Sequence, residues 1–323
     1  MNPNTLSEMP CQPPIALITS ALAHAGEDQQ LMERLSLLET RRITSQKQLP
    51  TMQFLFRLFG KPCFPRGELI AITGKPKSGK TFVCSILMAL CQCQEVLGIV
   101  RESPQPLRVL WYDTEQSDES TQDILCHRIM PMIRSHTPSP DDPHADSSSI
   151  PAERDDQGLI VFNVRQDAWH ERMPLLETAI QHYQPDFVIL DGIRDLVNDI
   201  NDGVLAQEVV ERLMQLASSQ RCCIACILHQ NKSAEDKNLR GCIGTELTHK
   251  AFEVYECTKS DERIFSLCQK LTRKYDITDT LKYVVDEQGI PQLAAMEQHA
   301  YAAQPVQPVQ PVQHDAPRPA LNP

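Results

Sequence analysis

The stretch Gly74-Lys75-Pro76-Lys77-Ser78-Gly79-Lys80-Thr81 decides the fold, because it fits the pattern G-x-x-x-x-G-K-[ST] of a phosphate-binding P-loop. An apolar run at residues 68–73 precedes it and predicts a strand, and a second run at residues 82–90 follows it and predicts a largely buried helix. Strand, glycine loop and helix are the context in which this motif binds a nucleotide. The alternative is a glycine turn between a strand and a helix that binds nothing.

Each residue type in this loop has a chemical reason. The backbone N–H groups of the loop and the N-terminus of the following helix form a concave site for phosphates. Gly74 and Gly79 permit the tight path. Lys80 is expected to reach the β- and γ-phosphates of ATP, and the Thr81 hydroxyl is expected to bind Mg²⁺. The predicted nucleotide-binding set is Gly74, Lys75, Pro76, Lys77, Ser78, Gly79, Lys80, Thr81 and Phe82.

Composition and charge indicate an ordinary globular protein. The 323 residues are 41% hydrophobic and 23% charged, and no apolar run approaches the roughly 20 residues that cross a bilayer. The N-terminus lacks the basic region of a secretory signal, so we expect a cytoplasmic protein without a membrane partner. The net charge of −11 argues against nucleic acid wrapped around the whole surface, but is compatible with a local basic groove.

Twelve cysteines could suggest disulfides or a metal site. Several, such as Cys222, Cys223 and Cys226, lie in apolar runs typical of buried strands, and we interpret them as reduced core residues. The spacing of these three with His229 is a weak metal signal, because ligands along one strand would point to both of its faces.

The chain predicts three regions. Residues 1–48 form an N-terminal extension with a helix at 28–41, whose apolar stripe of leucines packs on its own domain or on a neighbouring subunit. Residues 49–295 form the catalytic domain, in which residues 135–158, rich in Ser, Pro and Asp, are a disordered insertion. Residues 296–323, with their Pro- and Gln-rich repeat, are a disordered tail.

Strands and helices alternate within the domain. After the P-loop helix, expected to reach about residue 97, we predict strands at 107–113, 159–163, 187–191 and 222–228 and helices at 119–133, 171–183 and 204–219. Residues 50–67 are expected to be a connection. A short helix at 245–252 and strands at 252–259, 263–273 and 281–286 are expected to add antiparallel edges. This pattern predicts one α/β domain with a mostly parallel sheet and helices on both faces.

Acidic residues at two strand ends are the candidates for catalysis. Four apolar residues and Asp191 form a Walker B strand, which places this carboxylate near Mg²⁺. The next residue is Gly192, so a water-activating glutamate must come from elsewhere. We expect Glu115, at the end of the strand at 107–113, to be the general base, with Asp113 in reserve. The alternative is a solvated acidic strand end.

These motifs, with the polar His229-Gln230-Asn231 after the fifth strand, resemble the RecA-like P-loop ATPases. Over about residues 49–290 the similarity is greatest to the branch of plasmid-encoded hexameric RepA helicases and related AAA ATPases of mobile elements. The resemblance implies that His229 or Gln230 senses the γ-phosphate. It also implies that residues 231–244, with Lys232, Lys237 and Arg240, line a central channel and contact single-stranded DNA.

The resemblance further implies basic fingers that reach the nucleotide of the neighbouring subunit from a late strand. Lys270, Arg273 and Lys274 are the candidates, although the close K-x-R spacing of replicative helicases is absent. A homo-oligomer, with a hexameric ring as one form, follows from the same resemblance. The alternative is a solvent-facing basic strand end.

The sequence therefore favours an ATP-hydrolysing, RecA-like protein that acts on DNA in plasmid or mobile-element replication or mobilisation. A rival is a regulatory ATP-dependent switch with protein partners and no DNA translocation, supported by the acidic surface and the tail. A second rival is a small-molecule kinase. It would need an arginine-rich lid, whereas the insertion at 135–158 is acidic.

Overall fold

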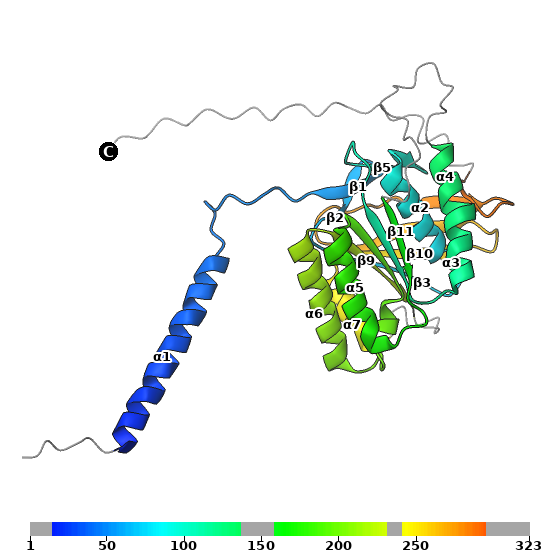
Figure 1. Cartoon of the computed structure of the whole chain (residues 1–323). Helices are drawn as coiled ribbons and strands as arrows, with labels where there is room; N and C mark the ends of the chain where they lie inside the picture. The colour runs from blue at the N-terminus through cyan, green and yellow to red at the C-terminus, as the bar shows by residue number, and fades with distance from the viewer. Residues whose placement is uncertain (1–14, 137–157, 231–240, 295–323) are drawn as a thin grey trace, which may run out of the picture. The chain divides into compact units, whose positions relative to one another are not determined.

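The computed structural model describes residues 15–136, 158–230 and 241–294 (Figure 1). The chain divides into two units, residues 1–51 and 52–323, and each is described by itself. The predicted disordered tail lies outside the described residues, as do nearly all of the predicted insertion and most of the predicted channel loop.

The first unit contains one long helix, α1 (Ile15–Arg41), of 27 residues. It begins well before the predicted start at residue 28, although it ends at the predicted residue. The side chains of Leu31, Leu35 and Leu38 are exposed. The apolar stripe that the sequence indicates is therefore present on the surface of this helix.

A sheet organises the second unit. Within the described residues it has nine strands in the order β13-β12-β11-β10-β3-β9-β8-β6-β7. The strands are β3 (Leu69–Gly74), β6 (Val109–Asp113), β7 (Leu159–Asn163), β8 (Phe187–Asp191), β9 (Cys223–His229), β10 (Glu253–Lys259), β11 (Phe265–Thr272), β12 (Leu281–Val285) and β13 (Pro291–Leu293). The run from β10 to β7 is parallel, and β11, β12 and β13 are antiparallel. The mostly parallel α/β fold is as predicted, but β10 is a parallel strand beside β3 and not an antiparallel edge.

Helices cover both faces of this sheet (Figure 1). One apolar core lies between the sheet and α2 (Lys80–Gln92), α3 (Asp118–Ile124) and α4 (Met130–Ser135). The second core lies between the opposite face and α5 (Trp169–Tyr183), α6 (Gly203–Gln220) and α7 (Gly241–Lys250). Every residue of β3, β6 and β8 is buried, as expected of parallel strands covered on both sides. The sheet is thus a rigid support for the loops at the carboxyl ends of its parallel strands.

A second, four-stranded sheet was not predicted. Residues expected to be a connection form a hairpin, β1 (Phe54–Leu58) and β2 (Lys61–Pro65), that turns at Phe59 and Gly60, both with positive φ. The P-loop helix ends at Gln92 rather than near residue 97, and the chain continues into β4 (Glu95–Val96) and β5 (Ile99–Arg101). The order is β2-β1-β5-β4. Strands β1 and β5, which pair in this sheet, are about forty residues apart, so no short-range sequence pattern indicated their pairing.

Other details also differ from the predictions. The helix expected at 119–133 is interrupted by a π-helical turn, η1 (Leu125–Ile129), between α3 and α4. Helix α7 begins at Gly241, inside the predicted channel loop, and not at residue 245. The short strand β13 was not predicted.

The cysteines in and just before β9 lie in the interior. Cys222, Cys223 and Cys226 are fully buried, as predicted, and Cys223 faces one core whereas Cys222 and Cys226 face the other. In the described part of the chain no group of three or more His, Cys, Asp or Glu side chains could hold a metal ion. Among the same residues, no helix has both the length and the apolar character needed to span a membrane.

Candidate nucleotide site

The P-loop joins the end of β3 to the start of α2, and its two glycines are sterically required. A Cβ on Gly79, where φ is 102°, would lie 2.6 Å from the Phe265 ring and 2.8 Å from the Tyr283 hydroxyl oxygen. A Cβ on Gly74 would lie 2.3 Å from the Ser78 Oγ. The Ser78 hydroxyl is buried and has no hydrogen-bond partner among the described residues. This backbone cradle with a spare donor fits the phosphate groups of a nucleotide.

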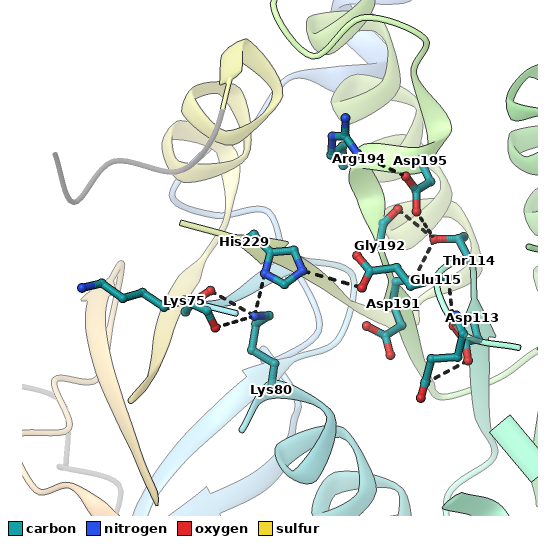
Figure 2. Close-up of polar contacts among 12 residues, drawn as sticks. Lys75, Lys80, Asp113, Thr114, Glu115, Asp191, Gly192, Arg194, Asp195 and His229 are labelled. Atoms are coloured by element: carbon teal, nitrogen blue, oxygen red, sulfur yellow. Dashed lines mark hydrogen bonds and ion pairs between the residues drawn. The ribbon is translucent and has the colours of Figure 1, made fainter. Parts of the chain in front are cut away.

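Lys80 is held at the centre of the site (Figure 2). Its Nζ donates hydrogen bonds to the carbonyl oxygens of Gly74 at 3.0 Å and Lys75 at 3.1 Å. It also lies 2.9 Å from the Nδ1 of His229, at the end of β9. Burial lowers the pKa of the Lys80 amine from its ordinary value. An ammonium whose partners are two carbonyls and a ring nitrogen gains from an anionic partner, and phosphate supplies one.

His229 connects Lys80 to the predicted base. An ammonium can only donate, so Nδ1 of His229 accepts from Lys80 and the ring proton lies on Nε2. This Nε2 is 3.6 Å from the Oε2 of Glu115 (Figure 2). Interaction with His229 lowers the pKa of Glu115 from its ordinary value, while burial acts in the opposite direction. Lys80 at the start of α2, His229 at the end of β9 and Glu115 just after β6 therefore form one polar chain.

Asp113 is engaged in local structure instead. One carboxylate oxygen accepts from the backbone N–H groups of Glu115 at 3.0 Å and Gln116 at 3.2 Å. The other accepts from the Thr121 hydroxyl at 2.6 Å and from the side-chain amide of Gln116 at 3.0 Å. The side chain is completely buried. Four hydrogen bonds fix the turn that presents Glu115 and leave Asp113 no exposed oxygen with which to approach a water molecule.

The residues expected to hold Mg²⁺ fit that ion. Asp191 ends β8, is 5% exposed, and lies opposite Asp113 in the register of β8 and β6. Burial raises its pKa to about 7, with further contributions from Asp113 and Glu115, so a cation beside it would favour the ionised form. Thr81 is half-buried in the first turn of α2. Mg²⁺ usually takes few protein ligands and completes its shell with substrate phosphates and water, which agrees with one carboxylate and one hydroxyl.

Gly192 explains why no glutamate follows Asp191. Its φ is 104°, and a Cβ there would lie 2.2 Å from the Oγ1 of Thr114 and 3.0 Å from the side chain of Glu115. The Thr114 hydroxyl lies 2.8 Å from the carbonyl oxygen of Asp191 and 2.9 Å from the carboxylate of Asp195. Thr114 and Glu115 thus occupy the space that a side chain at position 192 would need.

The structure separates the two candidate sensors. His229 contacts Lys80, whereas the Gln230 amide donates to the Oε1 of Glu256 at 2.7 Å. Lys270 forms an ion pair with the same carboxylate at 2.9 Å. Gln230 and Lys270 are therefore joined through Glu256 on β10, beside the site and not at Lys80.

The other two finger candidates, Arg273 and Lys274, lie at the opposite ends of the strands, near the start of β3. Arg273 follows Thr272, which pairs with Glu253 near the start of β3, whereas the P-loop is at the end of β3. Its guanidinium donates to the carbonyl oxygens of residues 249, 250 and 251 at the C-terminus of α7. The Lys274 amine lies over the rings of Phe54 and Tyr275. The structure does not bring Arg273 or Lys274 to the nucleotide site of their own chain.

Phe82, the last residue of the predicted nucleotide-binding set, packs beside the loop. Its ring meets Phe265 edge to face, and the Arg128 guanidinium lies 4.2 Å from its centroid. Lys75, Pro76 and Lys77 are exposed at the rim of the loop.

A cleft of about 450 Å³ opens beside Glu115 and His229. Sequence reasoning missed most of its charged lining, because these residues follow different strands and share no motif. The lining comprises Thr114, Glu115, Arg165, Arg172, Arg194, Asp195, Leu228 and His229. Their one shared signal was position, since most follow the carboxyl ends of the parallel strands β6, β7, β8 and β9.

A comparison with family models finds a match to an AAA domain at residues 56–235, more than half of the 323-residue chain. The chain belongs to the AAA domain family. The matched AAA domain includes the P-loop, Glu115, Asp191 and His229, so these residues lie in an ATP-binding ATPase domain of the RecA-like P-loop type. No curated protein matches the chain.

Proposed function

We propose that this AAA domain hydrolyses ATP as part of a homo-oligomer and acts on single-stranded DNA during the replication or mobilisation of a plasmid or other mobile element. The observation that supports hydrolysis is the polar chain from Lys80 through His229 to Glu115. It brings a phosphate-binding lysine and a partly exposed carboxylate to the same site at the carboxyl edge of the sheet.

In this proposal, different residues bind the phosphates, bind the metal ion and accept the proton. The P-loop backbone and Lys80 hold the β- and γ-phosphates, and Thr81 and Asp191 hold Mg²⁺, which when bound offsets negative charge on the phosphate oxygens. Glu115 accepts a proton from the attacking water. When the γ-phosphate accepts hydrogen bonds from the Lys80 amine, the Nδ1 of His229 no longer receives a hydrogen bond from Lys80. His229 therefore senses whether the γ-phosphate is present.

The DNA and assembly parts of the proposal rest on the resemblance to RepA-type helicases and mobile-element ATPases. Lys232, Lys237 and Arg240, which the resemblance assigns to a channel, lie outside the described residues. Lys270, Arg273 and Lys274 stay the proposed trans-acting fingers, and within the chain the Lys270 side chain is half exposed and paired with Glu256. The proposal includes a homo-oligomer, of which a ring of six subunits is one form.

The test is ATP turnover by the full chain with and without a single-stranded oligonucleotide. We expect turnover to rise with DNA and the protein to assemble when ATP is added, as measured by light scattering after size exclusion. A regulatory switch without motor activity would show ATP binding and no response to DNA. Loss of turnover in Lys80→Ala controls for contaminating ATPases.

A further inference from the structure

The cleft beside Glu115 has the chemistry of a binding site for anions. Three arginines line it, against the two carboxylates of Glu115 and Asp195, and Leu228 is the one aliphatic residue. Because the His229 ring is neutral, the three guanidinium charges exceed the charges of the two carboxylates, and Asp195 already accepts a hydrogen bond from Thr114. Positive charge therefore remains, and a polar, open cleft of this kind suits a phosphate better than an apolar ligand.

One of the three arginines is held by backbone hydrogen bonds, whereas the other two are exposed. Arg172 donates to the carbonyl oxygens of residues 165, 167 and 195, which fixes the loop carrying Arg165 against the loop carrying Arg194. Arg165 is exposed. The side chain of Arg194 is 49% exposed and lies 3.9 Å from Asp195, beyond hydrogen-bond distance. Arg165 and Arg194 are thus two exposed residues that line one cleft from loops that Arg172 joins.

An aromatic residue lies between two of these arginines in the sequence. Trp169 is the first residue of α5, between Arg165 and Arg172 in sequence, and its side chain is 39% exposed. Trp169 belongs to neither of the two apolar cores, so packing in the interior does not account for it. Arginines that bind phosphate, beside an aromatic ring that stacks on bases, are the usual elements of a single-strand binding surface.

We propose that this cleft binds the backbone of single-stranded DNA through Arg165 and Arg194, with Trp169 stacking on a neighbouring base, and that this contact stimulates ATP turnover. The inference rests on the proposed function, and names the residues through which DNA reaches the catalytic site.

The coupling follows from the position of Arg194. Its positive charge is one of the influences that lower the pKa of Glu115, after His229 and Lys80. A DNA phosphate bound to Arg194 offsets that charge, so Glu115 becomes a stronger base. The effect needs no movement of the backbone, because Glu115 and Arg194 line the same cleft.

Intrinsic fluorescence gives a direct test. The chain has two tryptophans, and Trp111 is 1% exposed, so quenching by an added oligonucleotide reports on Trp169. The full chain is titrated with oligodeoxythymidylate, and affinity is measured separately by the anisotropy of a labelled oligonucleotide at several salt concentrations. Arg165→Ala/Arg194→Ala is compared with Trp169→Ala and with Arg134→Ala, an exposed arginine on α4 that does not line the cleft. Thermal melting confirms that each variant is folded.

We expect the parent to be quenched, and Trp169→Ala to bind on the order of 10-fold more weakly. The double arginine variant should lose DNA stimulation of turnover, and its slope of log K against log salt should fall by about 0.7 for each lost phosphate contact. Arg134→Ala should match the parent. Parental affinity and slope in the double variant would overturn this site while leaving the proposed function intact. An oligonucleotide that neither binds nor stimulates the parent would reject both.

Discussion

Replacing Glu115 with glutamine separates catalysis from binding and from folding. The amide has nearly the size of the carboxylate and keeps an oxygen that can face the Nε2 of His229, but it cannot take a proton from water. Removal of a general base typically lowers the rate by about 10²–10⁴, which corresponds to about 3–5 kcal/mol in the barrier. The groups that hold the phosphates are on the P-loop and are unchanged. Glu115→Gln should therefore bind ATP·Mg²⁺ with parental affinity and fail to hydrolyse it.

The structure also predicts a small effect on stability. The side chain of Glu115 is 40% exposed and lies 3.6 Å from His229. Ion pairs exposed to solvent in this way contribute about 0–1 kcal/mol to the free energy of unfolding. The matched control is Asp113→Asn. Its buried carboxylate accepts four hydrogen bonds, and an asparagine would turn an N–H group toward the amide nitrogen of Gln116. Leaving buried partners unsatisfied costs about 1–3 kcal/mol, or several degrees in Tm for a domain of this size.

The assay is single-turnover hydrolysis with saturating protein, beside nucleotide affinity and thermal melting on both variants. We expect Glu115→Gln to be inactive with a nearly parental Tm, and Asp113→Asn to melt earlier while keeping hydrolysis at low temperature. If Glu115→Gln hydrolyses at the parental rate and a folded Asp113→Asn does not, the base is Asp113 and the reasoning from their hydrogen bonds is wrong.

Three other substitutions test the remaining parts of the site and the core. Lys80→Ala should lose nucleotide binding, measured by titration calorimetry, because the phosphates lose their nearest cation; unchanged affinity would remove the P-loop interpretation. Asp191→Asn should weaken ATP binding in Mg²⁺ much more than in EDTA, whereas an equal effect in both would argue against a role in holding the metal. Glu253, buried on β10, has a pKa raised to about 7 by burial, so its contribution to stability is complete below about pH 4.5 and is lost as pH rises through 7. Glu253→Gln should therefore raise Tm relative to the parent at pH 8 by more than at pH 5, and a pH-independent difference would show that this carboxyl does not titrate in the fold.

The sequence predicted the parts of the fold that depend on short-range patterns. Strands β7 and β8 were predicted to the residue, because each is a run of four apolar residues that ends in a polar residue, although only β8 is buried throughout. The hairpin of β1 and β2 was missed, since Pro62 and Pro65 in β2 are typical of connections and tolerated only in edge strands. Whether a strand is parallel, as for β10, depends on which neighbour it meets across the sheet.

The same limit applies to the site. Asp191 and Glu115 could be expected from the sequence because each ends an apolar run, and parallel strands present their carboxyl ends at one edge. Strand order could not be expected. The spacing of residues does not reveal that β9 lies between β3 and β8. Nor does it reveal that Arg165 and Arg194, which are far apart in the sequence, line one cleft.

Strand order also explains why His229 rather than a smaller residue suits the end of β9. Because β9 lies between the P-loop strand and the Walker B strand, the side chain at its end lies between Lys80 and Glu115. An imidazole spans that gap with one nitrogen that accepts and one that donates, so each partner orients the other. A phosphate that takes the proton donor from Nδ1 changes the electrostatic surroundings of Nε2 in the same ring. In the proposed mechanism, occupancy of the nucleotide site would therefore be communicated to Glu115 through a single side chain, without a hinge and without displacement of the sheet.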